Sequence, residues 1–195
     1  KVLNGLAALG AVAEAVTENV MRRVSDTQSP QGLLVALERT ELPIPSQTSF
    51  IFIPDLIRDP GNLGTMLRTA AAAGAEAVII PPDTADPFAP KTLRSGMGAQ
   101  FHLPILESDW EDISHRLKGL RVYLAASHEG TPYTQVDFRP PLTMIVGGEA
   151  EGASDTARQI STTRVQIPMP GSCESLNAAV AAGILMFEIV RQRTK

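Results

Sequence analysis

The sequence contains little of what marks secreted or membrane-spanning proteins. Cys173 is its only cysteine, so an internal disulfide is excluded and a reducing compartment is indicated. The two most apolar stretches, residues 75–82 and 178–190, are too short or too interrupted by small residues to span a bilayer. The chain does not open with a basic and then apolar leader segment. We therefore expect a cytoplasmic protein that does not enter a membrane.

Positive charge is also scarce. The 195 residues include 17 Lys and Arg against 21 Asp and Glu, which gives a net charge of −4. A protein that holds nucleic acid by bulk electrostatics needs clustered Lys and Arg to neutralise phosphates. A nucleic-acid enzyme of this composition must concentrate its positive charge locally, or obtain it from a partner subunit or another domain. The contents of hydrophobic residues, 44%, and charged residues, 19%, exclude a disordered or fibrous chain.

The first 45 residues differ in pattern from the rest. Valines recur every four residues between positions 12 and 24, which predicts an amphipathic helix. Turn-forming residues follow at 25–32, and the apolar run 33–37 predicts a short buried strand. One helix and one strand do not bury a core by themselves. We therefore interpret residues 1–45 as the end of a larger N-terminal domain plus a linker, followed by a second domain over residues 46–195.

Beyond residue 49, segments typical of buried strands alternate with segments typical of helices. The expected strands are residues 50–53, 77–80, 103–106, 122–125, 143–146 and 165–167. The expected helices are residues 62–73, 91–96, 109–117 and 176–192, of which the first has Asn62 as its expected N-cap and ends at Gly74. Apolar strands separated by helices predict an α/β fold with a mostly parallel sheet and helices on both faces.

Such sheets bind ligands beyond the carboxyl ends of their strands, which singles out the loops 54–61, 147–152 and 168–175. The second loop is rich in glycine, but Glu149 stands where a dinucleotide fingerprint needs glycine. A carboxylate there repels a pyrophosphate, and the chain has no Gly-Lys-Ser or Gly-Lys-Thr phosphate loop. The loop is expected to serve a ligand without phosphates, such as S-adenosylmethionine. A tight glycine turn without a ligand is the alternative.

The other two loops lead into helices. Ser175 and Asn177 fall at the start of the last helix, where free backbone amides point outward. A helix cap alone is the alternative there. Arg68 lies nearly two turns inside a helix of mostly apolar or small residues and is suited to a bidentate grip on phosphate. Its pairing with Asp55 or Asp59 is the alternative.

Other kinds of site find little support. The histidines, His102, His115 and His128, lack the spacing of metal ligands, so we expect no metal. Nothing in the sequence favours a Ser-His-Asp or Cys-His hydrolase. A nucleotide-dependent oxidoreductase on a doubly wound sheet stays open as an alternative, although Glu149 disfavours it.

Three segments strongly resemble the SpoU (TrmH-like) family of the SPOUT methyltransferases. They are residues 55–74 (DLIRDPGNLGTMLRTAAAAG), 145–154 (IVGGEAEGAS) and 167–188 (IPMPGSCESLNAAVAAGILMFE), and residues 94–104 (RSGMGAQFHLP) are similar to the family's linking segment. The resemblance implies a parallel sheet with a C-terminal trefoil knot and a homodimer whose site is completed across the interface. It implies methyl transfer from S-adenosylmethionine to a ribose 2′-hydroxyl of structured RNA, with ribosomal RNA favoured over transfer RNA. Residues 1–45 would then end a small RNA-binding domain.

The same resemblance implies the site residues. Those of the adenosine pocket are Gly147, Ile167 and Leu176. Those of the polar active site are Asn62, Arg68, Glu149, Ser175 and Asn177. A guanidinium, with a pKa of about 12 or higher, is a poor base at neutral pH. We therefore expect Arg68 to hold the adjacent phosphate and stabilise the developing alkoxide, with the proton acceptor left unassigned.

Two consequences of the resemblance stay hypotheses at this point. Dimerisation would bring together basic residues from two chains and so answer the shortage of positive charge. These residues are Arg58, Arg68, Lys91 and Arg94. The alternative function is a non-catalytic RNA-binding or assembly factor that keeps the fold without transferring a methyl group.

Overall fold

The N-terminal residues form a separate unit with two short helices. The structure, a computed structural model, describes residues 2–25, 27, 29–39, 41–149, 151–172 and 174–194. The chain divides into units 1–40 and 41–195. The first unit holds α1 (Val2–Ala8) and α2 (Glu18–Ser25), and neither helix has a buried residue.

The predicted amphipathic helix is confirmed only in its second half, since Val20 and Val24 lie in α2 whereas residues 11–17 are not helical. The predicted strand was wrong, because the apolar run 33–37 forms no strand. Every residue of that run is exposed. The physical reason is that the described part of residues 1–40 offers neither a second strand for backbone pairing nor a core against which apolar side chains could pack.

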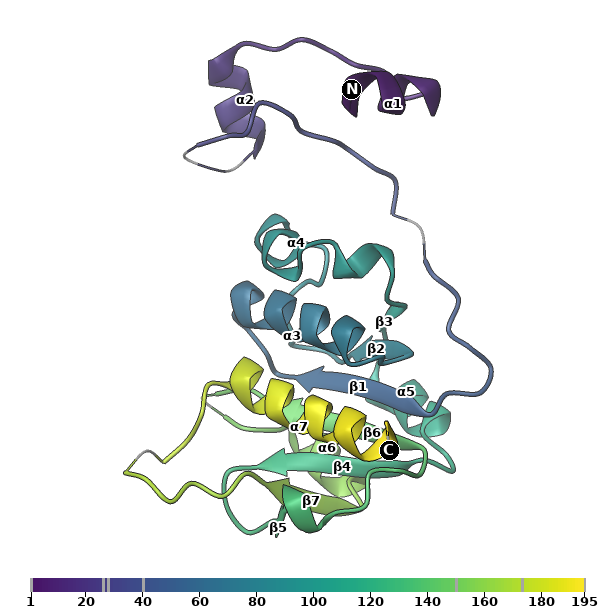
Figure 1. The fold of residues 1–195 in the computed structure, drawn as a ribbon, viewed down its shortest axis with the longest axis vertical. Helices are drawn as coiled ribbons and strands as arrows, with labels where there is room; N and C mark the ends of the chain where they lie inside the picture. The colour runs from purple at the N-terminus through teal and green to yellow at the C-terminus, as the bar shows by residue number, and fades with distance from the viewer. Residues whose placement is uncertain are drawn as a thin grey trace. The chain divides into compact units, whose positions relative to one another are not determined.

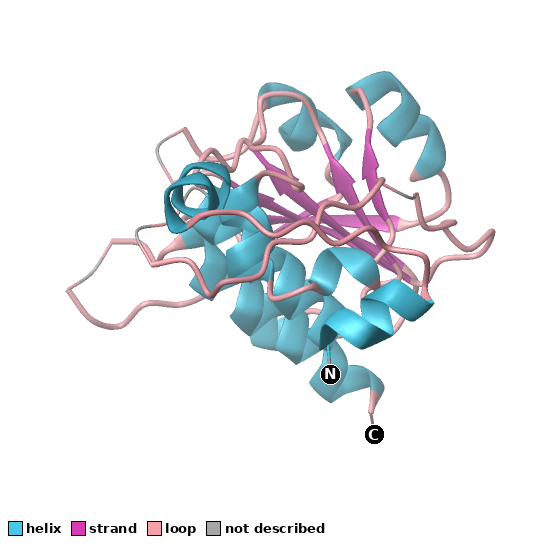
Figure 2. Ribbon diagram, turned by 90° about the horizontal axis from the view of Figure 1, so that it is seen from above, coloured by secondary structure: helices cyan, strands magenta, loops and turns pink. Residues whose placement is uncertain are grey.

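The second unit is built on one seven-stranded sheet. Its strands are β1 (Phe50–Asp55), β2 (Ala77–Ile80), β3 (Ile105–Glu107), β4 (Arg121–Ala126), β5 (Thr131–Pro132), β6 (Leu142–Gly147) and β7 (Thr163–Gln166). They lie in the order β3-β2-β1-β6-β4-β7-β5, and every strand pair is parallel. The predicted parallel α/β sheet is therefore confirmed. Figure 2 shows its strands as one twisted layer between helices.

Helices cover both faces of this sheet. They are α3 (Pro60–Ala72), α4 (Pro90–Gly96), α5 (Trp110–Arg116), α6 (Asp155–Ile160) and α7 (Ala178–Arg193), with 3-10 turns η1 (Ala99–Phe101) and η2 (Tyr133–Gln135). One buried cluster joins the sheet to α3 and α7, and a second joins its other face to α5 and α6. In Figure 1, α3 and α7 lie side by side over the first face. All expected strands and helices of this unit are present within two residues, whereas the short β5 and α6 were not anticipated.

Helix α3 begins differently from the prediction. Asp59, and not Asn62, caps it by accepting the Asn62 backbone N–H at 2.9 Å. Pro60 occupies the first turn, where its fixed φ suits a helix and its missing N–H costs no hydrogen bond. The helix is followed by Gly74 with φ +73°, as its glycine predicts. Because Asp59 provides the cap, the Asn62 side chain is left for other contacts.

The outer side of α3 packs closely against α4. A Cβ on Gly64 would lie 1.9 Å from Ser95 Oγ and 2.5 Å from the Thr92 carbonyl oxygen, so only glycine fits there. Gln100 is buried under this contact and donates to the Pro87 and Thr92 carbonyls at 3.1 and 3.2 Å. The segment 90–101 therefore fixes the helix that carries Asn62 and Arg68.

No described helix has the length and apolar character needed to cross a bilayer.

Candidate functional site

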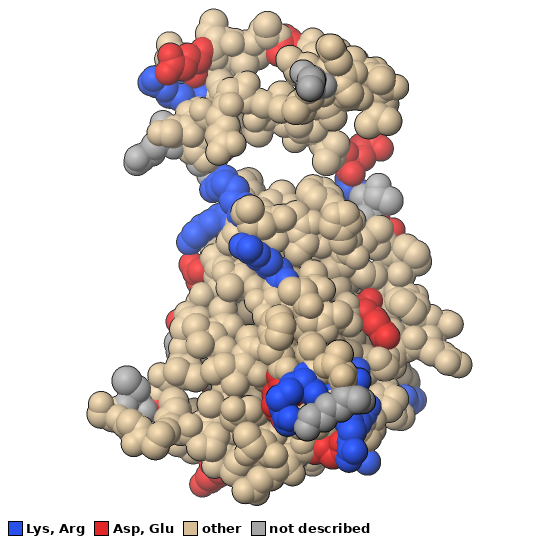
Figure 3. Space-filling model, viewed as in Figure 1, with Lys and Arg blue, Asp and Glu red and all other residues tan. Residues whose placement is uncertain are grey.

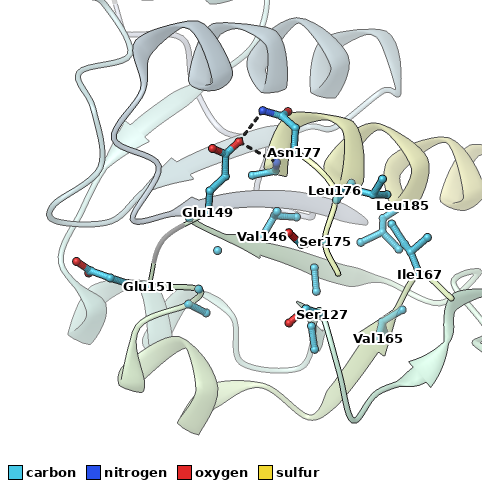
Figure 4. A pocket seen from close by; sticks show the side chains of 18 of the residues that line it. Ser127, Val146, Glu149, Glu151, Val165, Ile167, Ser175, Leu176, Asn177 and Leu185 are labelled. Atoms are coloured by element: carbon cyan, nitrogen blue, oxygen red, sulfur yellow. Dashed lines mark hydrogen bonds between the residues drawn. The ribbon is translucent and has the colours of Figure 1, made fainter. Parts of the chain in front are cut away.

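A cavity of about 590 Å³ lies beyond the carboxyl ends of β4, β6 and β7 and beside the start of α7. The three residues predicted for the adenosine pocket all line it: Gly147, Ile167 and Leu176. Figure 4 shows Val165, Ile167 and Leu185 together on one side of the cavity, with Glu149 and Asn177 at the other end. The sheet thus brings two of the three suspected loops to one cavity.

Two predicted polar residues from distant parts of the chain, Asn62 and Asn177, meet at a third, Glu149. Its Oε1 accepts hydrogen bonds from Asn62 Nδ2 at 3.0 Å, Asn177 Nδ2 at 2.5 Å and the Ala178 backbone N–H at 3.3 Å. Asn177 also donates to Asn62 Oδ1 at 3.1 Å. No described residue donates to the second carboxylate oxygen of Glu149, Oε2. The cluster therefore fixes the carboxylate through one oxygen and leaves the other for a ligand.

Asn177 has a second task in this cluster. Its Oδ1 accepts the backbone N–H groups of Ala179 and Val180 at 2.9 and 3.2 Å, which makes Asn177 the N-cap of α7. The amide group is thus oriented by the helix on one side and by Glu149 on the other (Figure 4). Asn177 can therefore cap the helix, as the alternative held, and also belong to the predicted site.

The glycines of the second loop serve close backbone approach. Gly148 and Gly152 exchange backbone hydrogen bonds of 2.9 and 3.1 Å, which close the turn that carries Glu149. A Cβ on Gly147 would lie 2.4 Å from the Ala153 nitrogen. A Cβ on Gly148 would lie 2.4 Å from the carbonyl oxygen of Leu56. Only Gly152 has a positive φ, +70°, so the glycines at 147 and 148 are required by their neighbours rather than by a phosphate.

A buried carboxylate that sequence reasoning missed supports this turn. Asp55 ends β1, pairs in register with Gly147, and accepts the Ser154 backbone N–H through Oδ2 at 2.6 Å. Its Oδ1 is buried and has no hydrogen-bond partner among the described residues. Burial raises the pKa of the Asp55 carboxyl, and the hydrogen bonds of Ser154 and the charge of Arg158 partly oppose this. The signal in the sequence that could have identified Asp55 was a single Asp at the end of a predicted apolar strand.

Arg68 and Ser175 lie apart from the Glu149 cluster. Arg68 is exposed on α3, lines neither cavity, and has no partner among the described residues. The alternative pairing with Asp55 or Asp59 was wrong, because those carboxylates accept from Ser154 and Lys91. Ser175 lines the larger cavity and is exposed. The roles of both residues stay predictions.

The described residues contain no group of three or more His, Cys, Asp or Glu side chains arranged to hold a metal ion. The loop before α7 also contains Cys173, which lies outside the described residues. In that loop the described residues 168–172 and 174–176 make no hydrogen bond to any described residue. This wall of the larger cavity is therefore not joined to the rest of the described chain by hydrogen bonds.

A second cavity of about 160 Å³ adjoins the first. Both are lined by Gly148, Glu149, Glu151 and Ala178. The second is bordered further by Arg58 and Asp59 of the first suspected loop and by Asn62 in the first turn of α3. All three suspected loops therefore meet around Glu149, as the strand pattern predicts.

The basic residues near the second cavity are paired with acids. Arg58 Nη2 lies 3.1 Å from Glu151 Oε2, and Lys91 Nζ lies 3.0 Å from Asp59 Oδ2. Lys91 and the backbone N–H of Asn62 lower the pKa of the Asp59 carboxyl. Two of the four cations expected to serve RNA are thus neutralised in the isolated chain.

The remaining positive charge does not form a continuous stripe in the view of Figure 3. One group of Lys and Arg covers the last turns of α7, which carry Arg191 and Arg193. Arg193 donates to the carbonyls of Phe138, Ser49 and Pro140 at 3.0, 2.9 and 2.9 Å, and burial lowers its pKa. Arg191 pairs with Glu188 at 2.7 Å. Arg193 thus ties the end of α7 to the segments that precede β1 and β6, at the end of the strands opposite the cavities, whereas the pair of Arg191 lies within α7.

Comparison with known proteins gives the family. The model of the SpoU rRNA Methylase family matches residues 49–187. The 23S rRNA (guanosine(2553)-2′-O)-methyltransferase RlmP of Bacillus subtilis (strain 168) is 36% identical over 176 residues, which cover 89% of this chain and 71% of that protein. The 23S rRNA (guanosine-2′-O-)-methyltransferase RlmB of Pseudomonas putida is 38% identical over 192 residues, which cover 95% and 75%.

Two solved structures agree with this. An AdoMet-bound rRNA methyltransferase from Sinorhizobium meliloti has a TM-score of 0.87 and 31% identity, covering 97% of this chain and 76% of that one. The SpoU methyltransferase AviRb from Streptomyces viridochromogenes in complex with AdoMet has a TM-score of 0.72 and 33% identity, covering 78% and 61%. The predicted resemblance is confirmed, and the chain belongs to the SpoU rRNA methylase family.

Proposed function

We propose that this protein transfers the methyl group of S-adenosylmethionine to a ribose 2′-hydroxyl of large-subunit ribosomal RNA. The observation that carries the proposal is the Glu149 cluster, in which Asn62 and Asn177 hold one carboxylate oxygen at the rim of the larger cavity. Relatives named as 23S rRNA 2′-O-methyltransferases support the choice of RNA. Since both of those relatives are bacterial, the proposal implies a cytoplasmic enzyme.

The larger cavity has the chemistry that S-adenosylmethionine requires. Ile167, Leu176 and Val165 offer apolar contact to an adenosine, and Gly147 presents backbone without a side chain. The one guanidinium in the lining, of Arg158, donates to the backbone carbonyls of Ala153 and Glu151. The cavity is therefore better suited to a sulfonium than to a phosphate. The bound cofactor supplies an electrophilic methyl group to an in-line oxygen.

We infer distinct roles for the polar residues. Asn62 and Asn177 orient Glu149, whose Oε2 is available to accept a hydrogen bond from the ribose 2′-hydroxyl. Arg68 binds the neighbouring phosphate and stabilises the developing alkoxide. Ser175, on the cavity wall, positions the substrate or the methionine part of the cofactor. Positioning supplies much of the rate in such a displacement.

We further infer a homodimer with a trefoil knot near its C-terminus, in which Arg68 completes the partner's site. The support is that Arg68 stands on α3 beside an exposed apolar face of α7, where Val180 and Phe187 are 52% and 50% exposed. A second copy would cover that face. The assignment of residues 1–45 to the end of an RNA-binding domain rests on the resemblance alone. Sedimentation equilibrium of the wild type and of Phe187→Asp tests the dimer, since the variant is expected to be monomeric.

The decisive test joins two measurements on the same protein. Calorimetric titration with S-adenosylhomocysteine measures cofactor-site binding, and incubation of a bacterial large-subunit rRNA transcript with S-adenosylmethionine measures methyl transfer. A 2′-O-methyl group is located by its resistance to alkaline cleavage of the RNA backbone. Saturable binding with transfer at one ribose supports the proposal. Binding without transfer to any RNA would instead favour the non-catalytic assembly factor.

Arg68→Ala is expected to lower methyl transfer by roughly 10²-fold or more, because it removes stabilisation made in the transition state. Affinity for S-adenosylhomocysteine should stay within about twofold of the wild type, since Arg68 does not line the larger cavity. Arg116→Ala, on α5 at the other face of the sheet, is the matched control for loss of one exposed arginine. Loss of cofactor binding in Arg68→Ala would contradict the assigned role.

A further inference from the structure

The second cavity adjoins the proposed reaction site at Glu149, which lines both cavities. It is the smaller of the two, about 160 against 590 Å³, so it accepts only a compact group. Under the proposed function, Glu149 Oε2 faces the ribose 2′-hydroxyl. The base of the same nucleotide is attached to the neighbouring carbon of that ribose. The second cavity is therefore close enough to the reacting oxygen to receive the target base.

One wall of this cavity is apolar and held in place. Leu56, Ile57 and Ala178 line it. The Leu56 backbone N–H donates to Thr84 Oγ1 at 3.1 Å, and the Ile57 carbonyl accepts the Ala85 N–H at 2.8 Å. Leu56 also has a φ of +55°, which a side chain of this size seldom adopts unless its surroundings impose it. A flat ring can pack its face against such a wall.

The polar part of the lining is rich in hydrogen-bond acceptors. It consists of three carboxylates and one guanidinium, those of Asp59, Glu149, Glu151 and Arg58. The Asp59 carboxylate is occupied, since it accepts a backbone N–H and pairs with Lys91. Glu151 Oε2 accepts from Arg58 Nη2 at 3.1 Å, and no described residue donates to Glu151 Oε1. The cavity therefore fits a neutral group that carries N–H donors better than an anion.

The Arg58–Glu151 pair presents a donor beside two acceptors. The Watson–Crick edge of guanine has the complementary order, since O6 accepts while N1–H and the N2 amino group donate. The carboxylate of Glu151 can accept both donors, and an N–H of Arg58 can donate to O6. Uracil has one donor between two acceptors, and adenine and cytosine carry an amino donor where guanine has O6. Guanine is therefore the base that matches the pair at all three positions.

We propose that the second cavity receives the base of the target nucleotide and that the Arg58–Glu151 pair selects guanine. The inference rests on the proposed function and adds to it a contact that determines specificity. Arg58 orients the carboxylate, and Glu151 binds N1–H and the N2 amino group. In Figure 4 the Glu151 side chain points away from Ser175 and Ile167, so it does not serve the apolar part of the larger cavity. A bound base would cover the pair, whose side chains are 65% and 56% exposed, and strengthen its hydrogen bonds by excluding water.

RNA with one changed base tests the selection. Large-subunit rRNA fragments are synthesised with guanosine, inosine or uridine at the ribose that the protein methylates, and kcat/KM for methyl transfer is measured for each. Inosine lacks only the N2 amino group of guanosine. The wild type should prefer guanosine to inosine roughly 10- to 100-fold, the effect of one hydrogen bond to a charged group. Uridine should be a poorer substrate than inosine, because it faces the carboxylate with an acceptor.

Two variants separate the roles of the pair. Glu151→Ala should bring the preference for guanosine over inosine close to 1, since no carboxylate then binds the amino group. Arg58→Ala should lower transfer to both RNAs roughly tenfold and keep the preference, because both bases carry O6. Each preference is a ratio within one variant, so changes in folding or cofactor affinity cancel. Glu111→Ala, which removes an exposed carboxylate on α5, is the matched control and should keep the wild-type preference.

Several outcomes would overturn this inference alone. One is an active wild type that methylates a nucleotide other than guanosine or that uses guanosine and inosine equally. Another is a Glu151→Ala variant that keeps the wild-type preference. A third is a preference lost in Arg58→Ala and kept in Glu151→Ala, which would reverse the assigned contacts. A wild type that neither binds S-adenosylhomocysteine nor methylates RNA would refute the proposed function instead.

Discussion

Two loops border the larger cavity, and they are held in opposite ways. In residues 147–154, which are described except for residue 150, two backbone hydrogen bonds join Gly148 to Gly152, and the buried carboxylate of Asp55 accepts the Ser154 backbone N–H. Along residues 168–176, by contrast, the described residues make no hydrogen bond to the rest of the described chain, and none is buried. In Figure 1 this second loop extends away from the sheet before the chain returns at α7.

This difference in hydrogen bonding indicates different functions for the two loops. The closed turn carries Glu149, whose carboxylate must already point in the right direction when the substrate arrives, because reorientation during reaction would cost rate. The open loop carries Leu176, which lines the cavity and is 36% exposed. A ligand that covers this leucine gains apolar contact. Under the proposed function, methyl transfer depends on the turn that carries Glu149, and Leu176 of the other loop offers apolar contact to the cofactor.

A glycine in each loop gives the largest expected contrast. In Gly147→Ala the new Cβ meets the backbone of Ala153 and Gly152 at 2.4 and 2.5 Å, so the turn must shift. We expect affinity for S-adenosylhomocysteine to fall roughly 10- to 100-fold, in line with the cost of overpacking. Gly171→Ala is the control, because nothing lies within 4 Å of its Cβ and its φ is not positive. If calorimetry showed equal losses of affinity for S-adenosylhomocysteine in the two variants, the two loops would not differ in how they tolerate an added Cβ.

Asn177 joins the open loop to the fixed turn, and two substitutions separate its tasks. Asn177→Ala removes the cap of α7 and should cost about 1 kcal/mol of unfolding free energy. Asn177→Asp keeps a capping oxygen but places a carboxylate against Glu149, so it should retain stability and lose methyl transfer roughly 10²-fold. Urea unfolding and the transfer assay measure the two effects. Full activity in Asn177→Asp would show that Glu149 needs no donor from this residue.

Much of this contrast could be anticipated from the sequence. Apolar strands separated by helical segments predict the parallel sheet, and the rule that ligands lie beyond the carboxyl ends of strands groups the three loops correctly. The departure from the dinucleotide fingerprint at Glu149 pointed away from a phosphate ligand, and the family agrees with that interpretation. These inferences hold because the apolar pattern of each segment predicts a strand or a helix, and the alternation of strands and helices along the chain predicts a parallel sheet.

The contacts between loops were not accessible in the same way. Asn62 was expected to cap its helix, whereas Asp59 does so and leaves Asn62 to bind a residue 87 positions away. The support of Ser154 by Asp55 spans 99 positions. Nothing in a single sequence specifies which donor an acid will meet across such separations. The predicted strand at 33–37 failed for a related reason, since apolar patterning requires a partner surface to take effect.

The smallest expected effect concerns how Asp55 holds the fixed turn. Burial raises the pKa of its carboxyl above 3.8 in the folded protein, so protonation favours folding. That contribution is complete below the unfolded pKa and is lost as the pH rises through the folded pKa. Asp55→Asn cannot ionise and keeps an oxygen for the Ser154 N–H. Its unfolding free energy should therefore improve relative to the wild type as the pH rises from about 4 toward 7.

Urea unfolding across this pH range measures the difference between the two proteins. Asp137→Asn is the control of opposite sign, because Arg139 lowers the pKa of the exposed Asp137 carboxyl. That carboxylate favours the folded state above its unfolded pKa, and the benefit is lost as the pH falls through the folded value. If Asp55→Asn and the wild type changed in parallel with pH, the pKa of the Asp55 carboxyl would be the same in the folded and unfolded chains. The contrast between the two loops would then rest on Gly147 and its neighbours rather than on a buried charge.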